Sequence, residues 1–193
     1  NINLGGSGKS PLLLEILNIL VKTKKSPMVL TRGYKSGLRK NEFIVYRGSN
    51  VIYSNIVDTN KIIADEALMY SSLFPEVPII VGANRYKATK KFLKVSHYKP
   101  THYLLDDGFQ HRKIYRDIDL VLMDSSSNFN NEKIFPLGML RESKKSLLRA
   151  DHILLTYNNN KSDNKKLKKS LRKVTSNLIT SLNYEILWPT NVV

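Results

Sequence analysis

The segment NLGGSGKS, residues 3–10, decides how the rest of the chain is interpreted. Its three glycines let backbone N–H groups converge on an anion, Lys9 adds a positive charge for terminal phosphates, and Ser10 supplies a hydroxyl for Mg²⁺. The strict P-loop pattern expects a glycine where Asn3 stands. The apolar stretch 11–21 predicts a helix, which places the loop at a helix N-terminus that favours anions. The alternative is a glycine-rich turn that merely caps a helix. The predicted nucleotide-binding residues are Gly5, Gly6, Ser7, Gly8, Lys9 and Ser10.

The composition describes a basic chain without cysteine. Its 193 residues, 41% of them hydrophobic, suit one compact domain or one domain with a poorly developed second lobe. The absence of cysteine excludes disulfides and cysteine-ligated metals. Lys and Arg number 31 and Asp and Glu 16, so the formal net charge of +15 predicts an acidic partner. The net charge alone does not distinguish among three possible acidic partners: nucleic acid, an anionic membrane and a phosphorylated substrate.

Strands alternate with helices along the chain, which predicts an α/β fold with a mainly parallel sheet flanked by helices. The segments 42–46 and 51–57, joined through 48–50, predict a small β-hairpin insertion. The other predicted strands are 27–31, 78–81, 102–105, 118–123 and 152–156, and the other helices are 62–74 and 85–95. Because Asn1 falls in the turn that should follow a first strand, we expect a strand upstream of it. The fold class is P-loop NTPase-like.

The chain changes character after Thr156, so we predict a kinase core over 1–157 and an incomplete C-terminal lobe over 158–193. Residues 165–179 predict one basic helix. Two interpretations of it stay open, a helix lying on an anionic membrane and, more favoured, a packed helix with a solvated basic face. Its predicted apolar stripe consists of Leu167, Leu171, Val174 and Leu178.

Acidic and basic side chains follow the predicted strands. Asp106 and Asp107 end the strand 102–105, and two adjacent carboxylates repel unless a cation lies near them, so they predict a metal site. Asp65 begins a helix, where an acid either stabilises the helix dipole or accepts a hydroxyl proton. Three further features are open on residue type alone: Gln110, His111 and the pair Arg141-Glu142.

Taken in order, the motifs resemble one family, the tetraacyldisaccharide 4′-kinases, or lipid A 4′-kinases, of Gram-negative bacteria. The segment 1–11 is similar to that family's own P-loop, which also lacks the leading glycine. The matching motifs are Thr31-Arg32-Gly33-Tyr34, Asp65-Glu66, Asn84-Arg85, Asp106-Asp107-Gly108-Phe109-Gln110-His111, Pro136-Leu137-Gly138, Leu140-Arg141-Glu142 and Arg149-Ala150-Asp151. Ala67 departs from the family, which usually has proline there.

The resemblance implies transfer of the ATP γ-phosphate to the 4′-hydroxyl of a tetraacylated disaccharide 1-phosphate, with Mg²⁺, at the cytoplasmic face of the inner membrane. It implies that Asp65 is the base and that Ser10, Asp107 and Glu142 hold the metal. With Asp65, the resemblance makes Lys9, Asp106 and Asp107 catalytic, with Lys9 on the phosphates and the two acids around the metal or the phosphoryl group. The substrate-binding residues that it implies are Arg32, Arg85, Gln110, His111 and Arg141. It also implies a hydrophobic N-terminal anchor and a C-terminal histidine lobe outside 1–193, so we expect this form to be a peripheral and poorly active kinase.

Two other functions remain open. One is a nucleotide-binding P-loop fragment without turnover. The other is a basic nucleic-acid-binding P-loop protein. Because no nucleic-acid module is recognisable in the sequence, we predict no nucleic acid as a partner. The partners that the resemblance implies are a lipid disaccharide and an anionic membrane surface.

Overall fold

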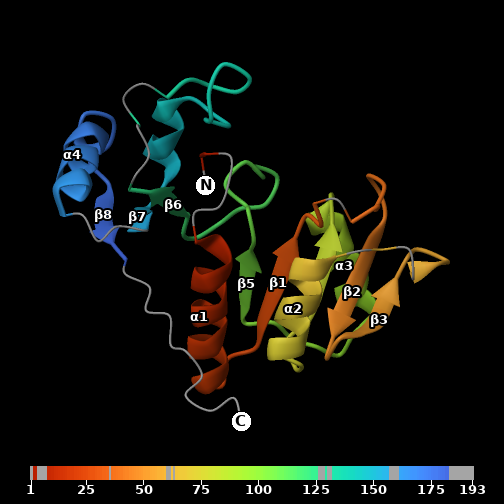
Figure 1. Cartoon of the computed structure of the whole chain (residues 1–193). Helices are drawn as coiled ribbons and strands as arrows, with labels where there is room; N and C mark the ends of the chain where they lie inside the picture. Colours follow the sequence, from red (N-terminus) through yellow and green to blue (C-terminus); the bar gives the residue numbers. More distant parts are fainter. Residues whose placement is uncertain are drawn as a thin grey trace, which may run out of the picture. The chain divides into compact units, whose positions relative to one another are not determined.

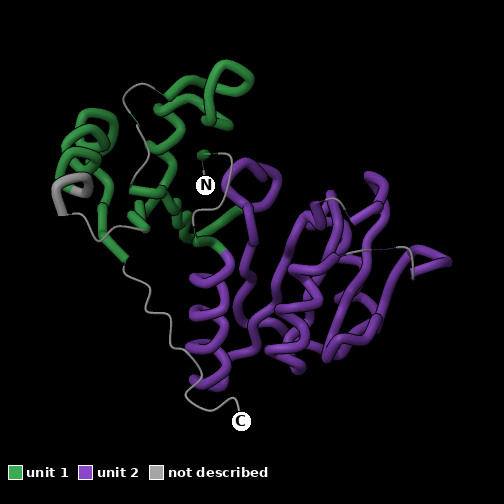
Figure 2. Tube along the Cα trace, in the orientation of Figure 1, with its two compact units in different colours: residues 1–9, 115–193 green, residues 10–114 purple. Residues whose placement is uncertain are grey.

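A computed structural model of the chain describes residues 2–3, 8–34, 36–59, 62, 64–125, 129, 132–156 and 161–182. The chain divides into two compact units, and we describe each by itself (Figure 2). One, which we call the sheet unit, contains residues 10–114. The other, the terminal unit, contains residues 1–9 and 115–193.

The sheet unit is built on five strands in the order β3-β2-β4-β1-β5. The parallel part consists of β1 (Pro27–Thr31), β4 (Ile79–Gly82) and β5 (His102–Leu105), with β1 in the middle. The strands β2 (Phe43–Arg47) and β3 (Asn50–Ser54) form the predicted hairpin. Because β2 pairs antiparallel with β4, the hairpin extends the main sheet and does not stand apart as an insertion.

Helices cover both faces of this sheet (Figure 1). The helices α1 (Lys9–Lys22) and α2 (Asp65–Leu73) lie on one face, and α3 (Arg85–Val95) lies on the other. Alternate residues of each strand point to opposite faces, as strand geometry requires. Thus Val29 packs with α1 and α2, whereas its neighbours Met28 and Leu30 pack with α3. A strand buried on both faces reads as a continuous apolar run, which explains why β1 is predictable from sequence.

The terminal unit contains a parallel three-stranded sheet in the order β6-β7-β8. Its strands are β6 (Leu120–Asp124), β7 (His152–Thr156) and β8 (Leu178–Ser181). A short 3₁₀ helix, η2 (Lys144–Arg149), precedes β7, and α4 (Lys161–Arg172) connects β7 to β8. The predicted boundary after residue 157 falls inside this connected sheet, whereas the compact units divide at residues 114 and 115.

The predicted helix over 165–179 is wrong at its C-terminal end. The helix ends at Arg172, and a turn follows in which the backbone N–H groups of Val174 and Thr175 both donate to the carbonyl of Leu171. Leu178 then belongs to β8 and is 59% exposed, so it is no part of the apolar stripe. The β-branched residues after the turn favour a strand.

The two remaining leucines of the stripe settle which interpretation of this helix holds. Leu167 and Leu171 are both buried in the protein, whereas Lys165, Lys166 and Lys169 of the same helix are exposed. Thus α4 is a packed helix with a solvated basic face. Within the described ranges, no helix combines the length and the apolar character needed to cross a bilayer.

The end of α4 gives a stability prediction. Leu171→Ala removes a fully buried side chain and should lower the free energy of unfolding by about 3 kcal/mol, whereas Leu178→Ala at an exposed strand position should change it by less than about 0.5 kcal/mol. Urea unfolding followed by circular dichroism measures both variants. Equal losses would contradict the end of α4 described above.

Candidate functional site

Two parallel strands of the sheet unit deliver the first functional side chains. The backbone N–H of Asp106 donates to the carbonyl of Leu30 (3.0 Å), which continues the β1–β5 pairing beyond the last residue of β5. The Thr31 hydroxyl, at the end of β1, donates to Oδ2 of Asp106 (3.4 Å). Both side chains are buried. The carboxyl ends of β1 and β5 therefore hold the carboxylate of Asp106, the first of the two adjacent acids, in one orientation.

The segment after β5 turns sharply at Asp107, whose backbone has φ of +47°. A Cβ placed on Gly108 would lie 2.6 Å from Cβ of Leu105, so the turn leaves room only for glycine. The Phe109 ring is buried, and the His111 backbone N–H donates to the Gly108 carbonyl (2.8 Å). These contacts anchor the turn in the sheet unit. Gln110 and His111 are half-buried on the same loop.

Arg85 is placed differently from the other predicted anion-binding residues. It is the first residue of α3 and only 3% exposed, and its Nη1 donates to the backbone carbonyl of Asp106 (3.1 Å). Asn84 caps the same helix by accepting from the backbone N–H of Lys87 (3.2 Å). The guanidinium of Arg85 therefore stabilises the turn at Asp106 from within the protein, a contact that the sequence alone did not reveal.

The loop after β1 presents the other arginine of this unit. Arg32 is exposed, so its guanidinium is accessible from solvent. It is followed by Gly33 with φ of +69°, where an added Cβ would lie 2.3 Å from Cγ1 of Val81. The loop thus leaves the sheet against β4, and only glycine fits at its first bend.

The predicted P-loop is described from Gly8 onward; Gly5, Gly6 and Ser7 lie outside the described residues. Gly8 has φ of +76°, and Lys9 and Ser10 are the first two residues of α1. The described part of the loop therefore ends at a helix N-terminus, as predicted. The backbone N–H groups and the dipole of such a terminus favour phosphate.

Ser10 is connected to α2. Its hydroxyl donates to Oε1 of Glu66, and the hydroxyl of Tyr70, one helical turn further along α2, donates to the same oxygen (3.0 Å). Sequence reasoning did not select either Glu66 or Tyr70 as a site residue. The only sequence signal that could have linked these two residues was their spacing of four, which puts two side chains on one face of a helix. That spacing does not show what the face contacts.

Asp65, the predicted base, is the first residue of α2 and is exposed. Its carboxylate has no hydrogen bond or ion pair with the rest of the described chain, whereas that of Glu66 accepts two hydrogen bonds. The two neighbouring acids therefore differ in environment. Glu66 is held in place by Ser10 and Tyr70, and Asp65 is accessible from solvent.

Arg141 and Glu142 belong to the terminal unit. The backbone N–H of Arg141 donates to the Ile2 carbonyl (2.6 Å), and Asn3 pairs with Leu140. Both oxygens of Glu142 accept from Nη2 of Arg149, at 3.1 and 2.9 Å. Glu142, the acid predicted to hold the metal, thus forms an ion pair with an arginine of its own unit. It belongs to the terminal unit, whereas Asp106 and Asp107 belong to the sheet unit.

Oxygen donors suitable for Mg²⁺ occur in the sheet unit. Mg²⁺ prefers one or two carboxylates, a hydroxyl, waters and phosphate oxygens, and Ser10, Asp106 and Asp107 offer the first two kinds. Because Ser10 donates its hydrogen to Glu66, the lone pairs of its oxygen remain available for a cation. No group of three or more His, Asp or Glu side chains with the geometry of a metal cage occurs within the described ranges.

The sheet unit therefore combines a helix N-terminus preceded by a P-loop-like sequence with the buried Asp106 at the ends of two parallel strands. A model of the family described as tetraacyldisaccharide-1-P 4'-kinase matches residues 1–187. The chain belongs to this family. The segments 106–111 and Asp65-Glu66, on which the resemblance to this family is based, lie at the end of β5 and at the start of α2.

Curated relatives in the tetraacyldisaccharide 4'-kinase family are identical to this chain at about a third of the aligned positions. The relative from Desulfotalea psychrophila is 36% identical over 158 residues, which is 81% of this chain and 43% of that protein. The relative from Aquifex aeolicus is 33% identical over 159 residues, or 81% of this chain and 46% of the relative. The chain thus spans less than half the length of the curated relatives it matches.

A solved structure from the tetraacyldisaccharide 4'-kinase family has the same fold. The crystal structure of LpxK from Aquifex aeolicus in complex with ATP aligns with 95% of this chain and 69% of its own, with a TM-score of 0.67 and 24% sequence identity. It supports the P-loop kinase fold predicted from the sequence.

The contrast between the two arginines of the sheet unit is testable. Arg85→Lys keeps the charge but loses the planar guanidinium, so it should lower the free energy of unfolding by about 2 kcal/mol. Arg32→Lys at an exposed position is the matched control and should leave stability within about 0.5 kcal/mol of the parent. Thermal and urea unfolding measure both. If the free energy of unfolding of Arg85→Lys equalled that of the parent, the structural role assigned to Arg85 would be refuted.

Proposed function

We propose that this protein is an ATP-dependent kinase that phosphorylates the 4′-hydroxyl of tetraacyldisaccharide 1-phosphate in lipid A biosynthesis. The observation that carries the proposal is the arrangement of polar residues in the sheet unit. The first turn of α1, which follows a P-loop sequence, is hydrogen-bonded through Ser10 to the Asp-Glu segment of α2. The same unit holds the paired acids at the end of β5. Membership in the kinase family supplies the substrate class.

Nucleotide binding falls to the helix start in this proposal. The backbone N–H groups of the loop and the N-terminus of α1 bind the β- and γ-phosphates, and Lys9 places its charge on them. When bound, Mg²⁺ neutralises charge on the β- and γ-phosphates. Ser10 and Asp107 would hold it, with Asp106 oriented beside them by Thr31. We retain Glu142 as a proposed metal-site residue and Arg141 as a proposed substrate residue, both from the terminal unit.

The transfer step needs a group that accepts the proton of the acceptor hydroxyl. As the 4′-oxygen bonds to the γ-phosphorus, the bond from that phosphorus to the β,γ-bridging oxygen breaks, ADP leaves, and Asp65 takes the hydroxyl proton. The exposed carboxylate of Asp65 suits this role because an incoming substrate must reach it. The substrate is an anion, and we place it against the exposed Arg32 and the loop residues Gln110 and His111.

An anionic membrane surface is the proposed site of this reaction, at the cytoplasmic face of the inner membrane. The terminal unit exposes apolar side chains at residues 134–139, among them Phe135 (64% exposed) and Leu137 (81% exposed). Lys133 flanks this segment and is exposed as well. Apolar side chains beside cations are the combination that binds anionic bilayers, and the formal net charge of +15 adds long-range attraction.

Nucleotide affinity tests the first part of the proposal. Lys9→Ala removes a charge-assisted partner of the phosphates and should weaken Mg·ATP binding about 30-fold, or about 2 kcal/mol. Isothermal titration of residues 1–193 with Mg·ATP measures the change, with Lys22→Ala at the far end of α1 as a control that should bind like the parent. Equal affinities in the Lys9→Ala and parent proteins would refute the assignment of this loop.

Turnover tests the second part. In the full-length protein, Asp65→Ala should leave ATP affinity nearly unchanged and lower kcat about 10²–10⁴-fold, as expected for loss of a general base. The assay incubates enzyme with Mg·ATP and tetraacyldisaccharide 1-phosphate in detergent and resolves the lipid products by mass. ATP binding without any bis-phosphorylated lipid from the parent protein would favour a nucleotide-binding protein without turnover. Salt-dependent oligonucleotide binding without ATP turnover would favour the nucleic-acid alternative.

A further inference from the structure

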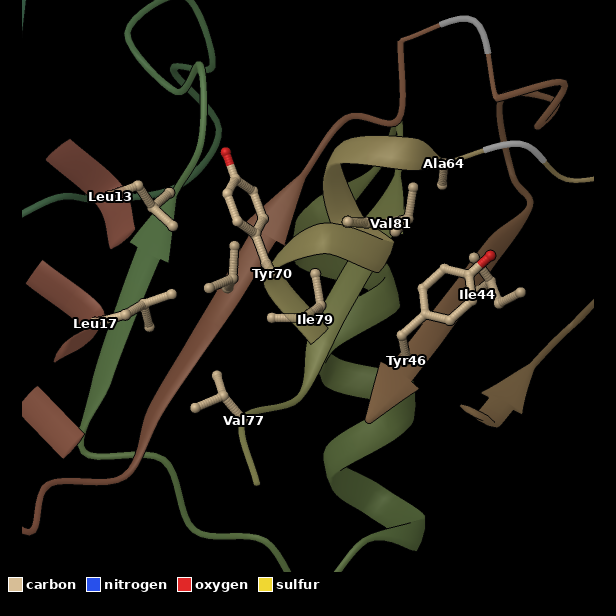
Figure 3. Packing of buried hydrophobic residues seen from close by; sticks show 11 residues of the cluster. Leu13, Leu17, Ile44, Tyr46, Ala64, Tyr70, Val77, Ile79 and Val81 are labelled. Carbon is tan, nitrogen blue, oxygen red and sulfur yellow. The ribbon is translucent and has the colours of Figure 1, made fainter. Parts of the chain in front are cut away.

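Tyr70 carries a hydroxyl at a core position that hydrophobic packing alone would not require. Its side chain is fully buried on α2, and the ring lies between the leucines of α1 and the apolar residues of the sheet (Figure 3). The ring fills a core position, where a leucine or phenylalanine would also serve. Its hydroxyl points in the direction in which β1 and β5 run, toward the end of the sheet where Asp106 lies (Figure 3).

The hydroxyl is hydrogen-bonded to a carboxylate that also binds the P-loop serine. Tyr70 Oη donates to Oε1 of Glu66 at 3.0 Å, and Oγ of Ser10 donates to the same atom. Two donors on one oxygen fix the position of the Glu66 carboxylate, because each removes a rotational freedom that the exposed side chain would otherwise keep. Ser10 is thereby held in one rotamer, with its hydrogen directed at Glu66.

We propose that Tyr70 is a positioning residue, which acts through Glu66 to present the lone pairs of Ser10 to the cation of a bound Mg·nucleotide. A serine hydroxyl has one hydrogen and two lone pairs, and it binds a metal only through a lone pair. When Glu66 accepts the hydrogen, the lone pairs point away from Glu66. This inference rests on the proposed role of Ser10 at a nucleotide-bound metal.

The electrostatics of the phenol support this role. Burial, with the negative charge of Asp106 added to it, raises the pKa of Tyr70 far above its ordinary value, and the Ser10 hydroxyl counteracts this only in part. These effects favour the protonated phenol, which is the form that can donate a hydrogen bond to Glu66.

The decisive measurement compares ATP affinity with and without Mg²⁺. Tyr70→Phe keeps the ring and removes only the hydroxyl, so it should weaken Mg·ATP binding about tenfold, as residues behind a metal ligand do, and change the affinity for ATP in EDTA by less than about twofold. Tyr98→Phe is the matched control, because it removes a hydroxyl that donates to the Pro27 carbonyl (2.7 Å) in the same unit. It should change neither affinity.

A double-mutant cycle separates positioning from packing. In a Ser10→Ala background, Tyr70→Phe should have no further effect on the ratio of the two affinities, because the hydroxyl through which it acts is gone. A tenfold effect that persists in that background overturns the proposal. So does an equal loss of affinity with and without Mg²⁺, since damaged packing would weaken both.

A second variant keeps the test valid if Tyr70→Phe unfolds, which thermal melting reveals. Glu66 is exposed, so Glu66→Gln leaves the core intact and removes the charge that holds both hydroxyls. It should reproduce the loss specific to Mg²⁺, and an unchanged ratio overturns the proposal. A parent protein that binds no Mg·ATP would instead refute the proposed kinase function, which distinguishes the two failures.

Discussion

The parallel pairing of β1 with β4 and β5 is the constraint on which the site depends. In a parallel sheet the carboxyl ends of neighbouring strands lie at one edge, and the turns that follow them share that edge. This pairing brings Thr31 to Asp106, and the turn after β4 starts α3, from which Arg85 reaches the Asp106 carbonyl. A one-residue slip of β5 would move Asp106 to the other face of the sheet.

Burial of polar groups at this edge is balanced by specific partners. Asp106 and Arg85 are both nearly inaccessible to water, and an unpaired charge in such a place destabilises a fold by several kcal/mol. The guanidinium contact to the Asp106 carbonyl and the Thr31 hydroxyl limit that cost. Asp106 is therefore held in one position, which suits the role that we propose for it beside the transferred phosphoryl group.

The sequence predicted the elements whose residues carry a strong local signal. The boundaries of β1, α3, β5 and β7 agree with those predicted, and continuous apolar runs mark the three strands in the sequence. The helix over 165–179 extended too far, since apolar spacing alone does not distinguish a helix from the turn and strand that begin after Arg172. The pairing of β2 with β4 was not predicted either, because strand partners far apart in sequence leave no local mark.

The sequence by itself determined which chemical groups this protein carries and to which family it belongs: a P-loop-like segment before a helix, paired acids after a strand, and a match to one kinase family. Those are local patterns, and residue identity and spacing suffice to read them. Only the tertiary structure decided which groups contact each other. It buried Arg85 and directed its guanidinium to the Asp106 carbonyl, paired Glu142 with Arg149, and joined Ser10 to Tyr70 through Glu66. Such contacts arise from packing between elements distant in the chain, so no pattern within a single segment encodes them.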